Sequence, residues 1–178
     1  MFDWLKSRRS QTETASEIYG AIVTRARTPG FYLKCGVSDT PVGRYELIVL
    51  TMVLVLDRLR QTEGAAVELQ RMVIEAFVTD MDDNMREMGV GDLTVPKKVK
   101  RAAAGLLERL ELYRAALAAA DSSALELALG ANIPAVAELP GAAANLANCV
   151  RADAAHLGTL IDAEVVAGII SFSTTPAA

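Results

Sequence analysis

The residues that most often do chemistry in proteins are scarce in this chain. His156 is the only histidine, and the two cysteines, Cys35 and Cys149, stand far apart in the sequence. A closed zinc site needs four ligands, and neither cysteine has a neighbour at metal-ligand or redox spacing. We therefore predict a protein that is not an enzyme and holds no metal and no cofactor. The two cysteines are interpreted as reduced thiols, and His156 as a residue of an alanine-rich helix without a catalytic role.

Two short motifs imitate ligand-binding loops without completing them. The segment Asp80–Asn84 resembles the start of a calcium loop, which requires glycine at its sixth position and glutamate at its twelfth. Those positions hold Met85 and Gly91 here. The glycines of Gly89–Gly91 follow a helical stretch rather than a strand, so we interpret them as a helix stop and not as a phosphate-binding loop.

Two groups of charged residues form the most informative polar feature. Acidic residues crowd the end of one predicted helix and basic residues crowd the start of the next, so each group opposes the dipole of its own helix. In a helical hairpin the two groups can screen each other, or they can face a partner. We call them together the hairpin charge cluster, and we predict partner binding for its members, Asp82, Asp83, Arg86, Glu87, Lys97, Lys98, Lys100 and Arg101.

Asp80 stands apart from that cluster because it follows Phe77 closely on the apolar side of the same predicted helix. We expect its carboxylate to be mostly buried, and a buried carboxylate needs a partner. Arg44 and Arg58 lie seven residues on either side of Thr51 and form a polar line along the preceding predicted helix. We predict an ion pair between Asp80 and one of these two arginines.

Apolar residues recur at helical spacing along the chain, and no alternating strand pattern appears. The sequence therefore predicts an all-α fold, a single helical domain of at least five helices around a central apolar helix. Two capping boxes, Thr14 with Glu17 and Ser123 with Glu126, indicate helix starts. The predicted helices cover residues 14–27, 31–35, 44–61, 65–88, 97–120, 123–129 and 142–157, with a further turn at 164–170.

Around this domain, 14–173, we predict a flexible N-terminal segment, 1–13, and a C-terminal tail, 174–178. The N-terminal segment either frays or docks on the body. Alternatively, Phe2, Trp4 and Leu5, followed by basic residues, give it a weak and peripheral affinity for a membrane surface. The most apolar run, Leu47–Leu56, is far shorter than the roughly 20 residues that span a bilayer, and we assign it to the core.

Composition narrows the class of protein further. A formal net charge of −4 does not suit phosphate neutralisation, so we predict no specific nucleic-acid partner. No signal peptide is visible in residues 1–9, and we expect a soluble, cytoplasmic chain. Hydrophobic residues make up 52% of it, which indicates a large buried interior or an exposed apolar face. Several methionines follow one helical stripe, which suits either a core or an adaptable binding surface, namely Met72, Met81, Met85 and Met88.

Two blocks of sequence resemble the ubiquinol–cytochrome c chaperone family. The first includes Gly36-Val37, Asp39-Thr40 and Gly43-Arg44-Tyr45-Glu46. The second runs from Asp80-Met81-Asp82 through Arg86-Glu87-Met88-Gly89-Val90-Gly91-Asp92-Leu93 to Pro96-Lys97-Lys98-Val99-Lys100. The resemblance extends over about residues 16–173.

This resemblance implies a chaperone that binds newly made cytochrome b, or another subunit of the cytochrome bc complex, by non-covalent holding. It also implies the ribosome or a small co-chaperone as further partners, and a peripheral place at the cytoplasmic face of the inner membrane. Two alternatives remain open on the residues alone. One is a small-ligand-binding protein that uses Arg44, Arg58 and Asp80, and the other is a helical oligomerisation module.

Overall fold

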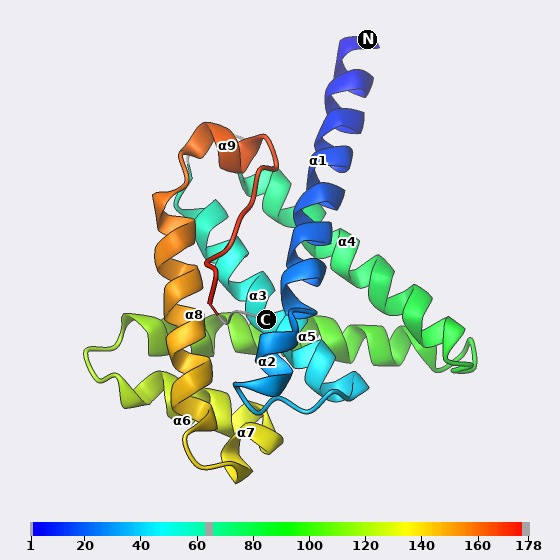
Figure 1. Ribbon diagram of the computed structural model, residues 1–178. Helices are drawn as coiled ribbons and strands as arrows, with labels where there is room; N and C mark the ends of the chain where they lie inside the picture. Colours follow the sequence, from blue (N-terminus) through cyan, green and yellow to red (C-terminus); the bar gives the residue numbers. More distant parts are fainter. Residues whose placement is uncertain (1, 63–65, 176–178) are drawn as a thin grey trace.

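The computed structural model describes residues 2–62 and 66–175, with the backbone alone for residues 2–10 and 134. Within these ranges the chain is helical and contains no strand, which confirms the predicted all-α class (Figure 1). The helices are α1 (Phe2–Ala26), α2 (Pro29–Leu33), α3 (Pro41–Arg60), α4 (Ala66–Glu87), α5 (Val95–Ala118), α6 (Ser123–Asn132), α7 (Pro134–Glu138), α8 (Ala142–Thr159) and α9 (Asp162–Val166).

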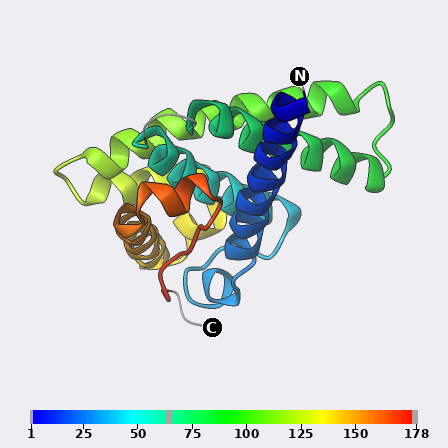
Figure 2. The same ribbon diagram turned by 90° about the horizontal axis from the view of Figure 1, so that it is seen from above.

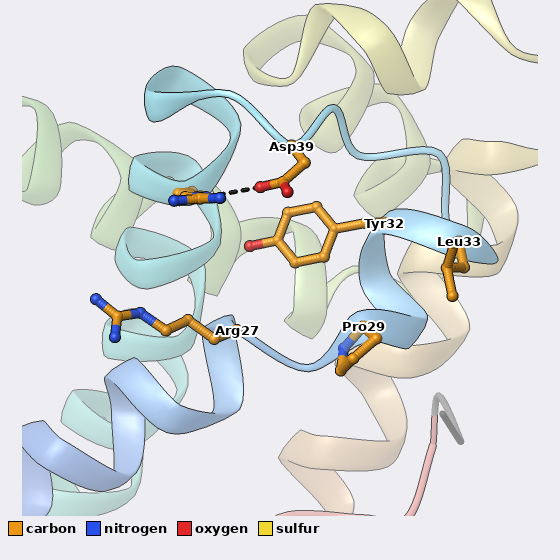
Figure 3. A pocket seen from close by; sticks show the side chains of 6 residues that line it. Arg27, Pro29, Tyr32, Leu33 and Asp39 are labelled. Atoms are coloured by element: carbon orange, nitrogen blue, oxygen red, sulfur yellow. Dashed lines mark hydrogen bonds and ion pairs between the residues drawn. The ribbon is translucent and has the colours of Figure 1, made fainter.

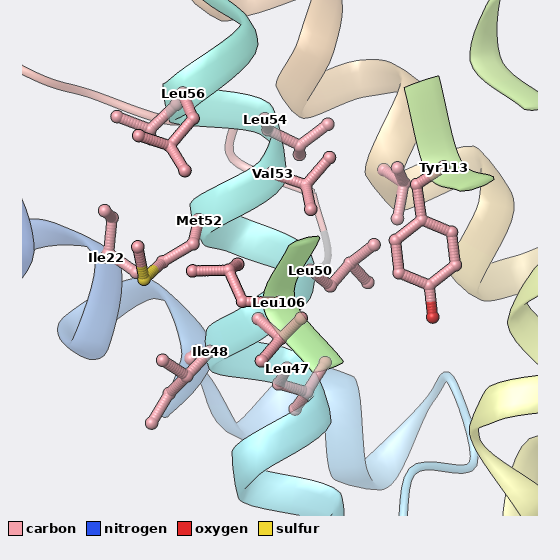
Figure 4. Packing of buried hydrophobic residues seen from close by; sticks show 14 of the residues in the cluster. Ile22, Leu47, Ile48, Leu50, Met52, Val53, Leu54, Leu56, Leu106 and Tyr113 are labelled. Carbon is pink, nitrogen blue, oxygen red and sulfur yellow. The ribbon is translucent and has the colours of Figure 1, made fainter. Parts of the chain in front are cut away.

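Helix α3 is the predicted central apolar helix. Its first turn is fixed by the Thr40 hydroxyl, which accepts the backbone N–H of Gly43 at 3.1 Å, and by Pro41 at the first helical position. From Leu47 to Leu56 every residue is buried. Helices α1, α4, α5 and α8 surround this helix, and Figure 4 shows Ile22, Leu106 and Tyr113 packed against it. Burial on all sides explains why its apolar residues form no single stripe.

Helices α4 and α5 form an antiparallel hairpin that extends to one side of the body (Figures 1 and 2). The end of α4 is a Schellman motif: Val90 N–H donates to the Met85 carbonyl at 3.0 Å, and Gly89 N–H to the Arg86 carbonyl at 2.9 Å. Gly89 has φ +75°, a left-handed conformation that glycine adopts without strain. The predicted helix stop is confirmed.

The C-terminal half packs on the other side of α3. Arg58 of α3 is buried, and its guanidinium donates to the carbonyls of Leu157 at 3.0 Å and Leu160 at 2.6 Å, which fixes the end of α8. After α9 the chain returns between α8 and α1 (Figure 2). There Ser173 bonds to Asp153, whose carboxylate also pairs with Arg25 of α1 at 2.8 Å. The last described residues therefore tie α1 to α8.

The predicted start of the first helix is wrong. Helix α1 begins at Phe2 rather than near Thr14, because residues 2–13 contain no glycine or proline to interrupt it. The side chains of Phe2, Trp4 and Leu5 lie outside the described residues, and with them the expected membrane affinity. The division of the chain into segment, domain and tail stays a prediction.

The second capping box is also wrong. Ser122, not Ser123, occupies the N-cap position of α6, and its side chain makes no capping bond. The Asp121 carboxylate accepts the backbone N–H of Ser123 at 2.9 Å instead. Between the predicted helices 123–129 and 142–157, where no helix was predicted, the structure contains the end of α6 and the short helix α7, which begins at a proline in the first helical position.

Candidate functional site

A groove of about 520 Å³ opens where the end of α1, α2, the start of α3 and the end of α4 meet. Helix α4 supplies Met81 and Met85 to one wall, and Met88 follows in the turn directly after this helix. The opposite wall contains three residues of α3, namely Val42, Tyr45 and Ile48. We call it the methionine groove. Its lining residues are Ala26, Arg27, Tyr32, Pro41, Val42, Arg44, Tyr45, Glu46, Ile48, Asp80, Met81, Asn84, Met85 and Met88.

The three methionines form a graded apolar wall. Met81 and Met85 lie on one face of α4, and Met88, in the turn that follows the helix, continues this row at a spacing of three residues. Met81 is buried, Met85 is half-buried, and Met88 is 63% exposed. Val42 faces solvent from α3 on the opposite wall, with 64% of its surface exposed. Unbranched thioether side chains adapt to irregular apolar surfaces, so this wall suits a partner of variable shape.

The rim of the methionine groove is polar. Asp80 is half-buried, and the Tyr19 hydroxyl donates to its carboxylate at 2.8 Å. Burial, together with this bond to Asp80, raises the pKa of Tyr19 far above its ordinary value. Arg27 extends from the end of α1, and no ion pair within 4.0 Å involves it in the described part of the chain. Among the described residues, the rim thus offers a cation that forms no ion pair.

A second pocket, of about 560 Å³, continues the groove past α2. Figure 3 shows the Tyr32 ring between Asp39 and Arg27, with Pro29 and Leu33 of α2 beyond it. The Arg44 guanidinium donates to Asp39 at 2.6 Å, and this bond lowers the pKa of Asp39. Since Arg27, Tyr32 and Arg44 line both depressions, the two form one continuous surface.

A third pocket, of about 530 Å³, adjoins the groove through Tyr45 and Met85 and lies along α5. Lys98 and Arg101 line it, so two members of the hairpin charge cluster border the same surface. At its inner side Arg109 donates to the buried Glu46 carboxylate at 3.1 Å. Burial raises the pKa of Glu46 although Arg109 opposes the shift.

The predicted ion pair of Asp80 is wrong. Asp80 is half-buried rather than buried, and its partner is the Tyr19 hydroxyl of α1. Arg44 lines the same groove but pairs with Asp39. Arg58 lies away from the groove and pairs with Asp162 at 2.7 Å. A phenol can satisfy a half-buried carboxylate without a second buried charge, which would itself need desolvation.

The hairpin charge cluster is exposed apart from the half-buried Asp82. Arg86 donates to Asp82 at 2.6 Å and to Asp92 at 2.7 Å. Within the described residues, no ion pair joins its acidic members to Lys97, Lys98, Lys100 or Arg101. Screening across the hairpin, the alternative to partner binding, therefore involves no direct ion pair between the two groups in the described part of the chain, and partner binding by this cluster stays a prediction.

Two residues that line the groove, Arg27 and Tyr32, and one residue of a buried ion pair, Asp153, were not predicted from the sequence. Arg27 and Tyr32 lie at helix ends where no periodic pattern marks them. Asp153, the buried partner of Arg25, could have been found, because it occupies a position of the stripe Leu146, Val150, Leu157 on α8. His156 is exposed and bonds through Nε2 to the Ser171 hydroxyl at 2.9 Å.

In residues 11–62 and 66–175, whose side chains the structure describes apart from that of residue 134, no group of three or more His, Cys, Asp and Glu side chains is arranged to hold a metal ion. Among the described helices none is both long and apolar enough to cross a membrane.

Comparison with known proteins then gives a consistent result. A family model described as ubiquinol-cytochrome C chaperone matches residues 33–172. A crystal structure of the Cbp3 homolog from Brucella abortus superposes with a TM-score of 0.82 and 35% sequence identity, covering 97% of each chain. Comparison with curated proteins gives no match.

Proposed function

The chain belongs to the ubiquinol–cytochrome c chaperone family, and from this premise we propose that it is an assembly chaperone of the cytochrome bc complex that binds newly made cytochrome b. Binding is non-covalent and involves no catalysed reaction. The client occupies the methionine groove. The observation that carries the proposal is this groove: an apolar wall graded from buried to exposed, bordered by the cation Arg27.

The chemistry of the groove suits such a client. Cytochrome b is a polytopic membrane protein, so its new segments present apolar side chains that must be shielded before assembly. A methionine wall can accommodate several such sequences, because thioether side chains repack at little free-energy cost. Charged groups at the rim then steer association and fix the direction of the client segment.

The remaining partners follow from the same proposal. A client of the inner membrane places the chaperone at the cytoplasmic face of that membrane, in peripheral contact. The ribosome or a small co-chaperone is a further partner in this proposal. The hairpin charge cluster, next to the groove through Lys98 and Arg101, is the surface that we assign to partner contact.

The test is capture of cytochrome b by the tagged full-length chain from detergent-extracted membranes. We expect the double variant Met85→Glu/Met88→Glu to fold, since Met88 is exposed and Met85 is half-buried at a groove. We expect it to lose most capture, because the new carboxylates would be desolvated by an apolar client. The control is Leu127→Glu on α6, where a similarly exposed apolar residue, at 71%, lies outside the groove.

Circular dichroism and the melting temperature establish that each variant is folded. Capture at the wild-type level by the folded double variant would exclude the methionine groove as the client site. Loss of capture in the Leu127→Glu control as well would assign binding to general surface apolarity. A small molecule retained by the wild type and lost with the double variant would favour the ligand-binding alternative, for which the groove has a suitable volume.

A further inference from the structure

The two cysteines lie together in the fold, although 113 residues separate them in the sequence. Cys35 follows α2 and Cys149 lies in α8, and their sulfur atoms are 3.4 Å apart. Both side chains are buried, at 1% and 4% exposure. They are the only cysteines of the chain, so no other thiol can compete for either partner within it.

The backbone around the pair is also in close contact. The side-chain amide of Asn145 in α8 donates to the Lys34 carbonyl at 3.3 Å. A Cβ added at Gly36 would lie 2.8 Å from the Cβ of Ala142, so glycine is required for this approach. Ala142, Asn145 and Cys149 lie along one side of α8, and the turn after α2 therefore rests on that side.

We propose that Cys35 and Cys149 are a dithiol that oxidises to an intramolecular disulfide and fastens the turn after α2 to α8. A disulfide has an S–S distance of about 2.05 Å, so the sulfurs must approach by roughly 1.4 Å. Small side-chain rotations supply this movement. The bond would hold α2, which carries Tyr32 beside the methionine groove, against the C-terminal half of the molecule.

A low-molecular-weight disulfide such as oxidised glutathione is the oxidant. One cysteine thiolate attacks it, forms a mixed disulfide and releases one glutathione thiolate. The second cysteine then attacks the protein sulfur of that mixed disulfide and releases the other. The two protons from the cysteines pass to the two glutathione thiolates, and the two electrons from the cysteines reduce oxidised glutathione to two glutathione thiols.

The native environment makes this exchange slow. Burial, reinforced by Cys149, raises the pKa of Cys35 to about 12, and burial raises the pKa of Cys149 as well. Both groups are therefore protonated thiols near neutral pH, and the thiolate is the reactive form. The disulfide forms when the region opens or while the chain folds, before both sulfurs are covered.

The experiment refolds the purified full-length chain from denaturant in a buffer of oxidised and reduced glutathione. We expect the monomer to lose both titratable thiols and two hydrogens in mass, with Cys35 and Cys149 joined in one peptide pair. Because the bond closes a long loop, we expect the melting temperature to rise by about 5–15 °C and to return after reduction.

Cys35→Ala and Cys149→Ala serve as controls. Each variant retains a single thiol, so its melting temperature should not rise in the same buffer. The comparison of oxidised with reduced wild type is decisive even if a variant fails to fold. A wild-type chain that keeps two free thiols, carries glutathione, or joins a second chain contradicts the proposal. So does an intramolecular disulfide that lowers the melting temperature. These measurements are independent of cytochrome b binding.

Discussion

At the scale of single residues, the buried ion pair of Arg25 and Asp153 is the most consequential polar contact in the described structure. The two side chains are 7% and 3% exposed, and the guanidinium donates twice to the carboxylate, from Nε at 2.9 Å and from an Nη atom at 2.8 Å. The Arg25 guanidinium also lies 4.9 Å from the centre of the Phe31 ring. Removing one member of such a pair leaves a desolvated charge.

Asp153→Ala should therefore lower the free energy of unfolding by about 3–5 kcal/mol, because Arg25 stays buried without its partner. In a chain of this size that corresponds to a fall in melting temperature of roughly 10 °C. Thermal unfolding followed by circular dichroism measures it. The matched control is Asp39→Ala, which removes the carboxylate of the exposed ion pair between Asp39 and Arg44. This substitution should leave the melting temperature unchanged. Equal effects of the two substitutions would show that burial does not govern these pairs.

At the scale of elements, the α4–α5 hairpin joins two features of the proposed binding surface. Its α4 arm carries the methionine wall, and its α5 arm places Lys98 and Arg101 beside the adjoining pocket. The Schellman motif at Gly89 fixes how the chain leaves α4. The basic residues of the hairpin make no ion pair with its acidic cluster among the described residues, so their charge is available to a partner.

Reversing Lys98 and Arg101 to Glu should leave the chain folded and reduce capture of cytochrome b, since an attractive charge near the groove becomes repulsive. Wild-type capture should also weaken as salt rises. Co-purification at several salt concentrations measures both effects. Arg60→Glu/Arg71→Glu is the matched control, because it changes the charge equally at exposed arginines outside the groove. Wild-type capture by the folded Lys98 and Arg101 variant would leave the hairpin charges with a structural role only.

At the scale of the whole molecule, periodic apolar patterns predicted the fold well. The continuous run Leu47–Leu56 identified the central helix because a helix buried on all sides needs no polar face. Gly89 identified the end of α4 because a left-handed residue favours glycine. The start of α1 was missed because Thr14 and Glu17 have capping spacing, yet the preceding residues are equally able to form helix.

The site was less predictable because its residues come together only through tertiary packing. The predicted helix at residues 65–88 contains Asp80, as α4 does in the structure. Its partner, Tyr19, lies in α1, 61 residues earlier in the sequence. The sequence predicted an ion pair of Asp80 with an arginine, whereas in the fold the Tyr19 hydroxyl donates a hydrogen bond to its carboxylate. The proximity of Cys35 and Cys149 was not predictable for the same reason. No spacing rule indicates that the turn after α2 rests on α8.

Burial of the tyrosines gives the molecule a defined response to alkaline pH. The pKa of each of the four tyrosines is raised above its ordinary value of 10.0, in every case chiefly by burial. Above pH 10 the unfolded chain releases phenolic protons that the folded chain retains. The free energy of unfolding should therefore fall as pH rises above about 10.

Ultraviolet titration of tyrosinate, recorded together with circular dichroism, measures this response. We expect tyrosinate to appear together with the loss of helix, and a chain in denaturant to titrate near pH 10 instead. Four tyrosines that ionise near pH 10 while the helices persist would contradict the burial described here.

The most direct measurement of the central claim places a photo-crosslinking amino acid at position 88, on the exposed end of the methionine wall, and at position 127 on α6 as the control. Each full-length chain is irradiated while cytochrome b is being synthesised on membranes, and adducts are identified by mass spectrometry. We predict that position 88 crosslinks to cytochrome b and that position 127 does not. Crosslinks to cytochrome b from position 127 but not from position 88 would contradict the assignment of the methionine groove as the client site.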